Sequence, residues 1–296
     1  MDPYAWSWNP EALVGVPLLT VAYLLALRRF PAPWWRIACF LVAMALVLVP
    51  LLTIAYLLAL RRFPAPWWRA VCFVAAMALL LAVTITPLET LALKYLLTIH
   101  LLQNVVLAEW APLLVVLGLP PALAGALARP GPVRTLTHPA VALPLWLANY
   151  MLWHLPWLYD TALENPHTLL HLEHALYFLT GVAMWWSVVQ DEPHRLGAGL
   201  RAGVVFAAFV LGSPIGLVLA LVPDAVYDFY VEAPERLWGL TALEDQQLAG
   251  IGMAVEQATV FFCVFAYWLL RFFADEERRQ AEEDRLEAEY PPVTRP

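Results

Sequence analysis

Repeated apolar stretches of about 20 residues run through this sequence and leave it few ways to fold. A soluble domain has about 25% charged residues, whereas this chain is 14% charged and 62% hydrophobic. Inside a bilayer, only helices and closed barrels satisfy every backbone hydrogen bond. We therefore predict an all-α fold, a polytopic helical membrane bundle. The candidate spans are residues 11–27, 37–60, 70–87, 92–117, 139–154, 168–189, 201–222 and 246–271.

An internal repeat occupies the N-terminal part of the chain. The sequence PLLTVAYLLALRRFPAPWWR at 17–36 returns as PLLTIAYLLALRRFPAPWWR at 50–69, and the two differ only at Val21 and Ile54. Two copies do not make a solenoid, which needs more repeats. We interpret the repeat as a recent tandem duplication of residues 17–49 and 50–82, or as a sequencing or assembly error.

Loop charges orient the spans, because basic loops of membrane proteins stay in the cytoplasm. Basic loops lie at 61–69, 118–138 and 190–200, and we expect them inside. Acidic loops lie at 155–167 and 223–245, and we expect them outside. The C-terminus is then cytoplasmic.

The duplicated segment conflicts with this orientation. A spanning helix at 37–60 would place Arg28, Arg29 and Arg36 outside, whereas removal of one copy leaves every basic loop inside. We therefore predict a seven-helix core plus one duplicated N-terminal span, with the N-terminus outside. The alternative is an extra helix that inverts the first segment.

Three regions follow from this pattern. Residues 1–87 hold the N-terminal spans with the duplication, residues 88–272 form the core membrane bundle, and residues 273–296 form a charged cytoplasmic tail. Much of the net charge of −7 lies in this tail, and nothing in the sequence indicates nucleic-acid binding. The cysteines form no Cys-x-x-Cys motif, so we expect neither a disulfide framework nor a thiolate metal site.

Polar side chains interrupt the apolar span at 92–117. His100, Gln103 and Asn104 share one helical face, and Glu109 follows them. Polar groups at membrane depth cost several kcal/mol each unless they find partners. This face should therefore point into the protein interior.

Other spans bring histidine or methionine to the same depth. From the helical rise, His100, His174 and Met253 each lie roughly 10 Å below the outer boundary of the bilayer. His171 precedes His174 by one turn, and His154 ends its span at the same boundary. A single histidine or methionine in a membrane helix is often a packing residue. The shared depth of several such residues instead favours a common site.

The last span adds a polar stripe. Gln246, Gly250, Met253 and Gln257 follow helical spacing along one face, and Glu256 lies near the midplane. An ionisable group at that depth is functional or pairs with another group. We expect His100 or His174 to be the partner of Glu256.

The side chains of this layer indicate the metal that they would bind. Soft, neutral imidazole and thioether groups without thiolates suit Cu(I). Zinc usually binds more histidine or carboxylate ligands in a closed tetrahedral site. A haem held between His100 and His174 is a further alternative.

Three sets of motifs in the chain resemble the CtaG-like cytochrome c oxidase assembly factors. They are HLLQN at 100–104 with APLLVVLGLP at 111–120, WHLPWLYDTAL at 153–163 with HTLLHLEH at 167–174 and Gly181, and LTALEDQQLAGIGM at 240–253. Members of that family are seven-helix proteins of the bacterial plasma membrane associated with copper delivery to haem–copper oxidases. The resemblance covers residues 90–285 well.

The resemblance also assigns residues to the family's characteristic polar positions. These residues are His100, Gln103, His154, His171, His174, Asp245 and Gln246. The chain departs from the family at two places. The family commonly has a histidine where this chain has Asn104, and a Trp-x-Pro-Gly ending where this chain has Ala254-Val255-Glu256-Gln257.

We therefore expect a non-enzymatic assembly factor of the respiratory chain, a membrane chaperone that holds Cu(I) transiently at the extracytoplasmic side. Its partner would be subunit II of a haem–copper oxidase or another copper chaperone. The expected ligands are His100 and His174, followed by His154, His171 and Met253. The polar residues around them, or along a polar path, are Gln103, Asn104, Asp245, Gln246, Glu256 and Gln257. The alternatives are a membrane transporter of copper or a small solute, and a haem-binding cytochrome.

Overall fold

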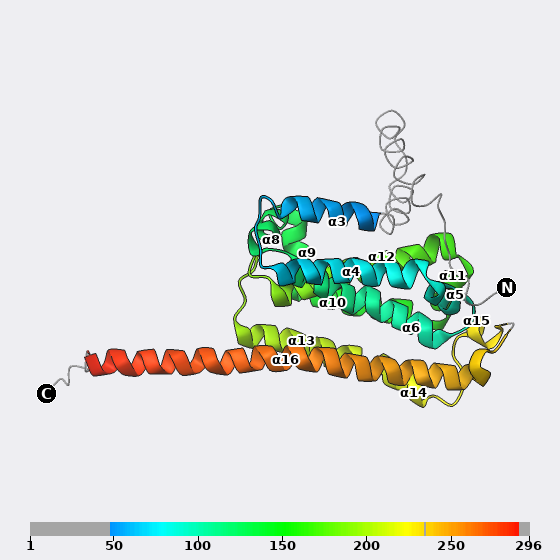
Figure 1. Cartoon of the computed structure of the whole chain (residues 1–296). Helices are drawn as coiled ribbons and strands as arrows, with labels where there is room; N and C mark the ends of the chain where they lie inside the picture. The colour runs from blue at the N-terminus through cyan, green and yellow to red at the C-terminus, as the bar shows by residue number, and fades with distance from the viewer. Residues whose placement is uncertain (1–47, 234, 290–296) are drawn as a thin grey trace.

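The computed structural model describes residues 48–233 and 235–289, which form an all-α bundle (Figure 1). The first half of this part contains α3 (Leu48–Ala59), α4 (Trp67–Ile85), α5 (Pro87–Lys94), α6 (Leu97–Val105), the π-helical η1 (Val106–Trp110), α7 (Ala111–Gly118), α8 (Pro121–Leu127), α9 (Gly131–Leu136) and α10 (Pro139–Trp153). The second half contains α11 (Pro156–Glu164), the π-helical η2 (Pro166–Leu170), α12 (His171–Val189), α13 (Ala198–Gly212), α14 (Pro214–Leu221), α15 (Asp228–Val231), the short 3-10 helix η3 (Leu237–Gly239) and α16 (Ala242–Glu289).

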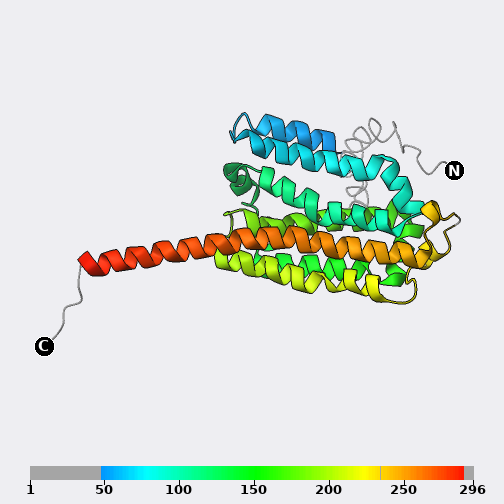
Figure 2. The ribbon, with the colours of Figure 1, turned by 60° about the horizontal axis from the view of Figure 1, so that its bottom comes forward.

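The membrane prediction is confirmed for this part of the chain. Four helical units are long and apolar enough to cross a bilayer: Trp67–Ile85, Leu97–Gly118, Ala198–Leu221 and Ala242–Glu289. Helices α10 and α12, of 15 and 19 residues, run alongside them (Figures 1 and 2). The expected span 11–27, residues 37–47 of the span 37–60 and nearly all of the first repeat copy lie outside the described residues.

The bundle has two distinct ends. Helices α5, α11 and α15 gather at one end, here called the α15 end, and α8 and α9 lie at the other, here called the α8 end (Figure 1). The acidic loop at 223–245 belongs to the α15 end, and the basic loop at 118–138 belongs to the α8 end. The two charge classes of loop are thus separated along the bundle axis.

A π-helical segment interrupts the unit Leu97–Gly118. The backbone N–H of Ala111 donates to the carbonyl of Val106, which is a bond one residue longer than in an α-helix. Helix α12 packs directly on this segment at Gly181. A Cβ on Gly181 would lie 2.2 Å from the Ala108 carbonyl oxygen and 2.8 Å from Cγ of Pro112. The absence of a side chain at Gly181 therefore sets the distance between α12 and η1.

A second close approach joins α14 and α16. A Cβ on Gly250 would lie 2.6 Å from the Gly216 carbonyl oxygen and 2.5 Å from the Ala220 backbone nitrogen. Small residues let membrane helices come together in this way, because dispersion between close backbones replaces the hydrophobic effect inside lipid.

Helix α16 runs well beyond the predicted end of its span at residue 271. It continues without a break to Glu289 and projects past the bundle at the α8 end (Figure 2). Ion pairs one turn apart, such as Arg278 with Asp275 at 3.9 Å and Arg279 with Glu276 at 3.5 Å, lie on this charged extension. Residues 273–289 of the predicted charged tail therefore continue the last membrane helix.

The close packing at Gly181 gives a testable expectation. Gly181→Ala should lower the free energy of unfolding by about 1–3 kcal/mol, because the new methyl group overlaps backbone atoms of η1. Thermal unfolding in detergent measures the change. The matched control is Gly203→Ala on α13, where a Cβ meets nothing within 4 Å. Equal unfolding temperatures for the two variants would contradict the proposed packing.

Candidate functional site

Three buried histidines come together at the α15 end of the bundle. His100 lies on α6, His154 follows α10, and His174 lies on α12; their exposed fractions are 0%, 9% and 5%. The rings of His100 and His174 meet edge to face, with centroids 6.2 Å apart. We call these three residues the histidine cluster. Two of them were the preferred metal ligands from the sequence, and the fold does bring those two together.

Two tyrosine hydroxyls meet Nδ1 of His100. The Tyr230 hydroxyl donates to the Ala92 carbonyl oxygen at 2.5 Å, and its oxygen lies 2.8 Å from Nδ1 of His100. Burial raises the pKa of the Tyr230 phenol well above its ordinary value, so the hydroxyl keeps its proton and Tyr230 offers Nδ1 an acceptor oxygen. The Tyr159 hydroxyl lies 3.0 Å from the same Nδ1. These contacts fix the orientation of the ring, and Nε2 of His100 has no hydrogen-bond partner.

The tautomer of His154 follows from its own hydrogen bond. Its Nδ1 lies 2.8 Å from the Tyr150 carbonyl oxygen, which can only accept. Nδ1 of His154 must therefore carry the proton, and its Nε2 holds a free lone pair. Tyr159 lies between the two histidines, with ring centroids 5.1 Å from His100 and 6.2 Å from His154.

The free nitrogens of the cluster share one property. The Nε2 atoms of His100, His154 and His174 are all buried and have no hydrogen-bond partner. A buried polar atom without a partner costs about 1–3 kcal/mol and calls for an explanation. Among the described residues, however, no three histidine, cysteine, aspartate or glutamate side chains are grouped closely enough to hold a metal ion. The cluster therefore offers metal-binding nitrogens without forming a closed site.

Asn104 and Glu173 form a polar pair beside the cluster. The Asn104 amide donates to Oε1 of Glu173 at 3.2 Å, and both side chains are almost fully buried. The sequence reasoning did not single out Glu173. A carboxylate between His171 and His174 in an apolar helix was the signal that could have revealed it. Gln103 faces α4 instead, where its amide donates to the Val83 carbonyl oxygen at 2.8 Å.

The tyrosines that surround the cluster depend on contacts at the α15 end. Asp160 of α11 accepts hydrogen bonds from the backbone N–H groups of Asp228 and Phe229, both at 3.2 Å, and so caps α15. Partial burial raises the pKa of the Asp160 carboxyl, although these two hydrogen bonds act in the opposite direction. The cap holds Tyr227 and Tyr230 over the histidines.

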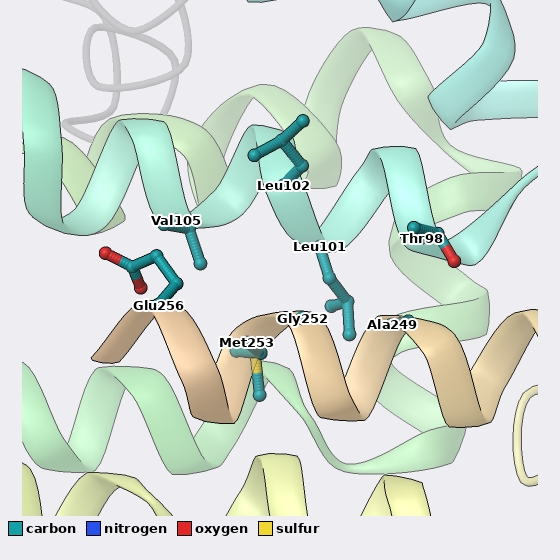
Figure 3. Close-up of a pocket in the computed structure, with 8 residues that line it drawn as sticks. All are labelled: Thr98, Leu101, Leu102, Val105, Ala249, Gly252, Met253 and Glu256. Carbon is teal, nitrogen blue, oxygen red and sulfur yellow. The ribbon is translucent and has the colours of Figure 1, made fainter. Parts of the chain in front are cut away.

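A groove lies between α6 and α16, with Thr98 and Glu256 at its opposite ends (Figure 3). Its volume is about 150 Å³. It is lined by Thr98, Leu101, Leu102, Val105, Ala249, Gly252, Met253 and Glu256. The walls are mostly apolar.

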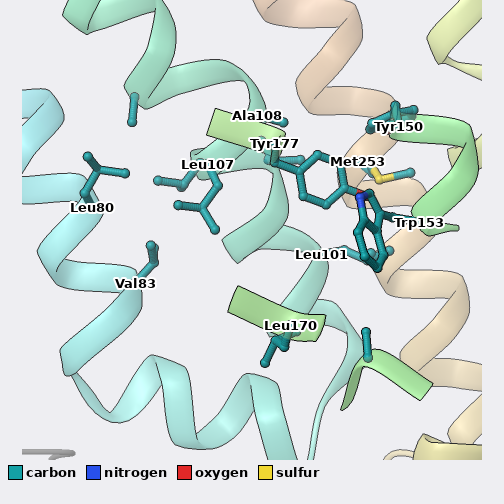
Figure 4. Close-up of a cluster of buried hydrophobic side chains, with 14 of the residues drawn as sticks. Leu80, Val83, Leu101, Leu107, Ala108, Tyr150, Trp153, Leu170, Tyr177 and Met253 are labelled. Atoms are coloured by element: carbon teal, nitrogen blue, oxygen red, sulfur yellow. The ribbon is translucent and has the colours of Figure 1, made fainter. Parts of the chain in front are cut away.

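Met253 and His171, two further ligands predicted from the sequence, lie beside the histidine cluster and are not part of it. Met253 is 3% exposed and belongs to the apolar core with Tyr150, Trp153 and Tyr177 (Figure 4). His171 is half-buried at the start of α12, and its Nδ1 contacts the Pro166 carbonyl oxygen. Neither residue has a ring or hydrogen-bond contact with His100 among those described.

Asp245 and Gln246 hold neighbouring segments in place. Asp245 accepts hydrogen bonds from the backbone N–H groups of Leu97 at 2.7 Å and Thr98 at 3.1 Å, so it caps α6 from another helix. Gln246 accepts from the Val226 N–H at 2.7 Å. The sequence had suggested that Glu244 and Asp245 cap their own helix. Glu244 does so through Thr241, whereas Asp245 caps α6.

Glu256 has a different partner from the one expected. It does not contact His100 or His174; it accepts a hydrogen bond from the Trp110 indole and interacts with Glu109. Gln257 donates to Oε1 of Glu109 at 2.9 Å and to the Tyr150 hydroxyl at 2.9 Å. The expectation failed because η1 directs Glu109 and Trp110 toward α16, which periodicity alone does not reveal.

Fold and site together define a helical membrane protein with a buried histidine cluster at one end of the bundle. The family model of the cytochrome c oxidase caa3 assembly factor matches residues 54–275. The match covers well over half of the chain, so the protein belongs to this family, and the resemblance seen in the sequence is confirmed. The match begins within the second repeat copy. No curated protein and no solved structure matches.

The cap that Asp245 provides can be tested against its neighbour. Asp245→Ala should cost about 2 kcal/mol, because it leaves the buried N–H groups of Leu97 and Thr98 without their acceptor. Thermal unfolding measures the loss. Glu244→Ala, which removes only an exposed cap, is the control and should lower the unfolding temperature less. A control that destabilises as much as Asp245→Ala would refute this role.

Proposed function

We propose that this protein is a non-enzymatic factor that carries copper as transient cargo during cytochrome c oxidase assembly. The role in oxidase assembly is inferred from the family, which is described as a cytochrome c oxidase assembly factor. The role in copper binding is inferred from the histidine cluster. The observation that carries the proposal is the set of buried Nε2 atoms without hydrogen-bond partners on His100, His154 and His174.

Neutral histidines with a hydrogen bond at one ring nitrogen are well suited to bind a metal through the other nitrogen. A neutral imidazole binds a metal through its unprotonated nitrogen, and a hydrogen bond at the other nitrogen fixes the ring and increases its basicity. Tyr230 and the Tyr150 carbonyl provide such bonds for His100 and His154. Imidazole is a ligand that suits copper. His100 and His174 would bind first because their rings are in contact.

A site that coordinates a copper ion incompletely can release the ion to a partner more easily than a closed site can. A structural metal site closes its coordination sphere, whereas the described residues group no three suitable side chains around one point. His154 would join as the ion moves, and His171 and Met253 lie at the margins of the cluster. Asn104 would act through its hydrogen bond to Glu173, where the family commonly has a histidine.

The loops support an extracytoplasmic position for the cluster. Acidic loops adjoin the α15 end and basic loops adjoin the α8 end, and basic loops stay in the cytoplasm. In the plasma membrane, the cluster would then face the side on which the copper-bearing subunit II of the oxidase, or another copper chaperone, is exposed. The C-terminal extension of α16 would lie in the cytoplasm.

Copper binding is measured on purified protein under reducing conditions. We expect one copper ion per chain, lost in the double variant His100→Ala/His174→Ala because both nitrogen ligands are removed. The matched control is His138→Ala/His194→Ala, which alters a second pair of histidines whose ring centroids are 4.8 Å apart near the surface. This control should retain copper. If the unaltered protein contains no copper, or if the control variant loses its copper, His100 and His174 are not the copper ligands.

A further inference from the structure

We propose that Glu109 and Glu256 form a proton-binding site inside the membrane, separate from the histidine cluster. Glu109 projects from η1 and has no exposed surface. Glu256 projects from α16 and accepts a hydrogen bond from the Trp110 indole. The bond from Trp110 of η1 to Glu256 and the bond from Gln257 of α16 to Glu109 cross between the two helices, so the two carboxyl groups lie near each other and each acts on the charge of the other. These bonds join η1 to α16 near the middle of the bundle.

Two adjacent carboxylates can only accept hydrogen bonds, so without a proton they would repel each other. Within the described residues, neither group takes part in a salt bridge. Unpaired charge inside a bilayer is strongly unfavourable, and two adjacent charges are worse than one. The pair therefore holds at least one proton in place of a basic partner.

The surroundings of the pair stabilise a single shared proton. The Gln257 amide donates to Oε1 of Glu109 and to the Tyr150 hydroxyl, so it favours negative charge on Glu109. Tyr150 is the other titratable group that interacts with the pair. The remaining oxygens are Oε2 of Glu109, Oε2 of Glu256 and Oε1 of Gln257, and all three are buried without a partner. The two carboxyl oxygens can carry the proton, and the Gln257 oxygen can only accept a hydrogen bond from it.

The two carboxyl groups differ in access. Glu256 lines the groove between α6 and α16 (Figure 3), whereas Glu109 does not line it and has no exposed surface. Glu256 is therefore the residue through which the proton exchanges. Loss of the proton would place two negative charges side by side and push η1 away from α16. The unit that contains η1 also carries His100, so proton occupancy would act on the helix that positions the histidine cluster.

Labelling with dicyclohexylcarbodiimide tests the site in the full-length protein in detergent. The reagent adds to a protonated carboxyl: the acid proton goes to nitrogen, the carboxylate oxygen bonds to carbon, and rearrangement gives a stable N-acylurea without a leaving group. Peptide mass mapping should find this adduct on Glu256 and not in Glu256→Gln. The internal control is Glu282, an exposed carboxyl on the same helix. Glu256 should still react at a pH where Glu282 no longer does.

The variant Glu109→Gln tests whether the two groups act as a pair. In the unaltered protein, loss of the last proton leaves two adjacent negative charges, whereas in Glu109→Gln it leaves one. The pH at which labelling of Glu256 is half-lost should therefore fall by about one unit or more in this variant. An unchanged midpoint, or labelling of Glu256 with the same pH dependence as Glu282, overturns the proposal. Copper content does not enter this test, so the outcome is independent of the cargo assignment.

Discussion

The burial of hydrogen-bonding side chains in an apolar bundle is the constraint on which this structure depends. Lipid offers no partners, so each polar group must find one on a neighbouring helix. Asp245 caps α6 from α16, Gln246 holds the backbone beside α14, and Gln103 reaches a carbonyl of α4. These bonds fix the helices at the positions where the remaining polar groups meet.

Two polar centres remain after those structural bonds are accounted for, and both include a residue of the unit Leu97–Gly118. The histidine cluster includes His100 of α6, and the carboxyl pair joins Glu109 of η1 to Glu256 of α16. The π-helical segment lies between His100 and α7 and changes the faces that the following side chains present. One irregularity of the backbone thus separates a nitrogen centre near the α15 end from an oxygen centre near the middle of the bundle.

Much of the fold could be predicted because its signal is local. Apolar length predicted the spans that correspond to Trp67–Ile85, Leu97–Gly118, Ala198–Leu221 and the first part of Ala242–Glu289, and helical spacing placed His100, His174 and Gln257 on buried faces. The side chains that each buried polar residue contacts were harder to predict. Glu256 was expected beside a histidine but contacts Trp110 and Glu109, since a π-helical turn leaves no clear periodic signature. Glu173 and the tyrosines of the cluster were missed because tyrosine at a span end is ordinarily an interface residue.

The motif His100-Leu-Leu-Gln-Asn104 shows where sequence and tertiary structure divide. The sequence alone determined that this segment is a membrane helix, that its polar face is buried and that the chain resembles its family, because apolar length, helical period and motif identity are written along the chain. Only the tertiary structure decided that Tyr230 and Tyr159 contact Nδ1 of His100, that Asn104 binds Glu173 and that Gln103 faces α4. Those choices depend on side chains far away in the sequence, whose positions follow from helix packing and from the close approach at Gly181.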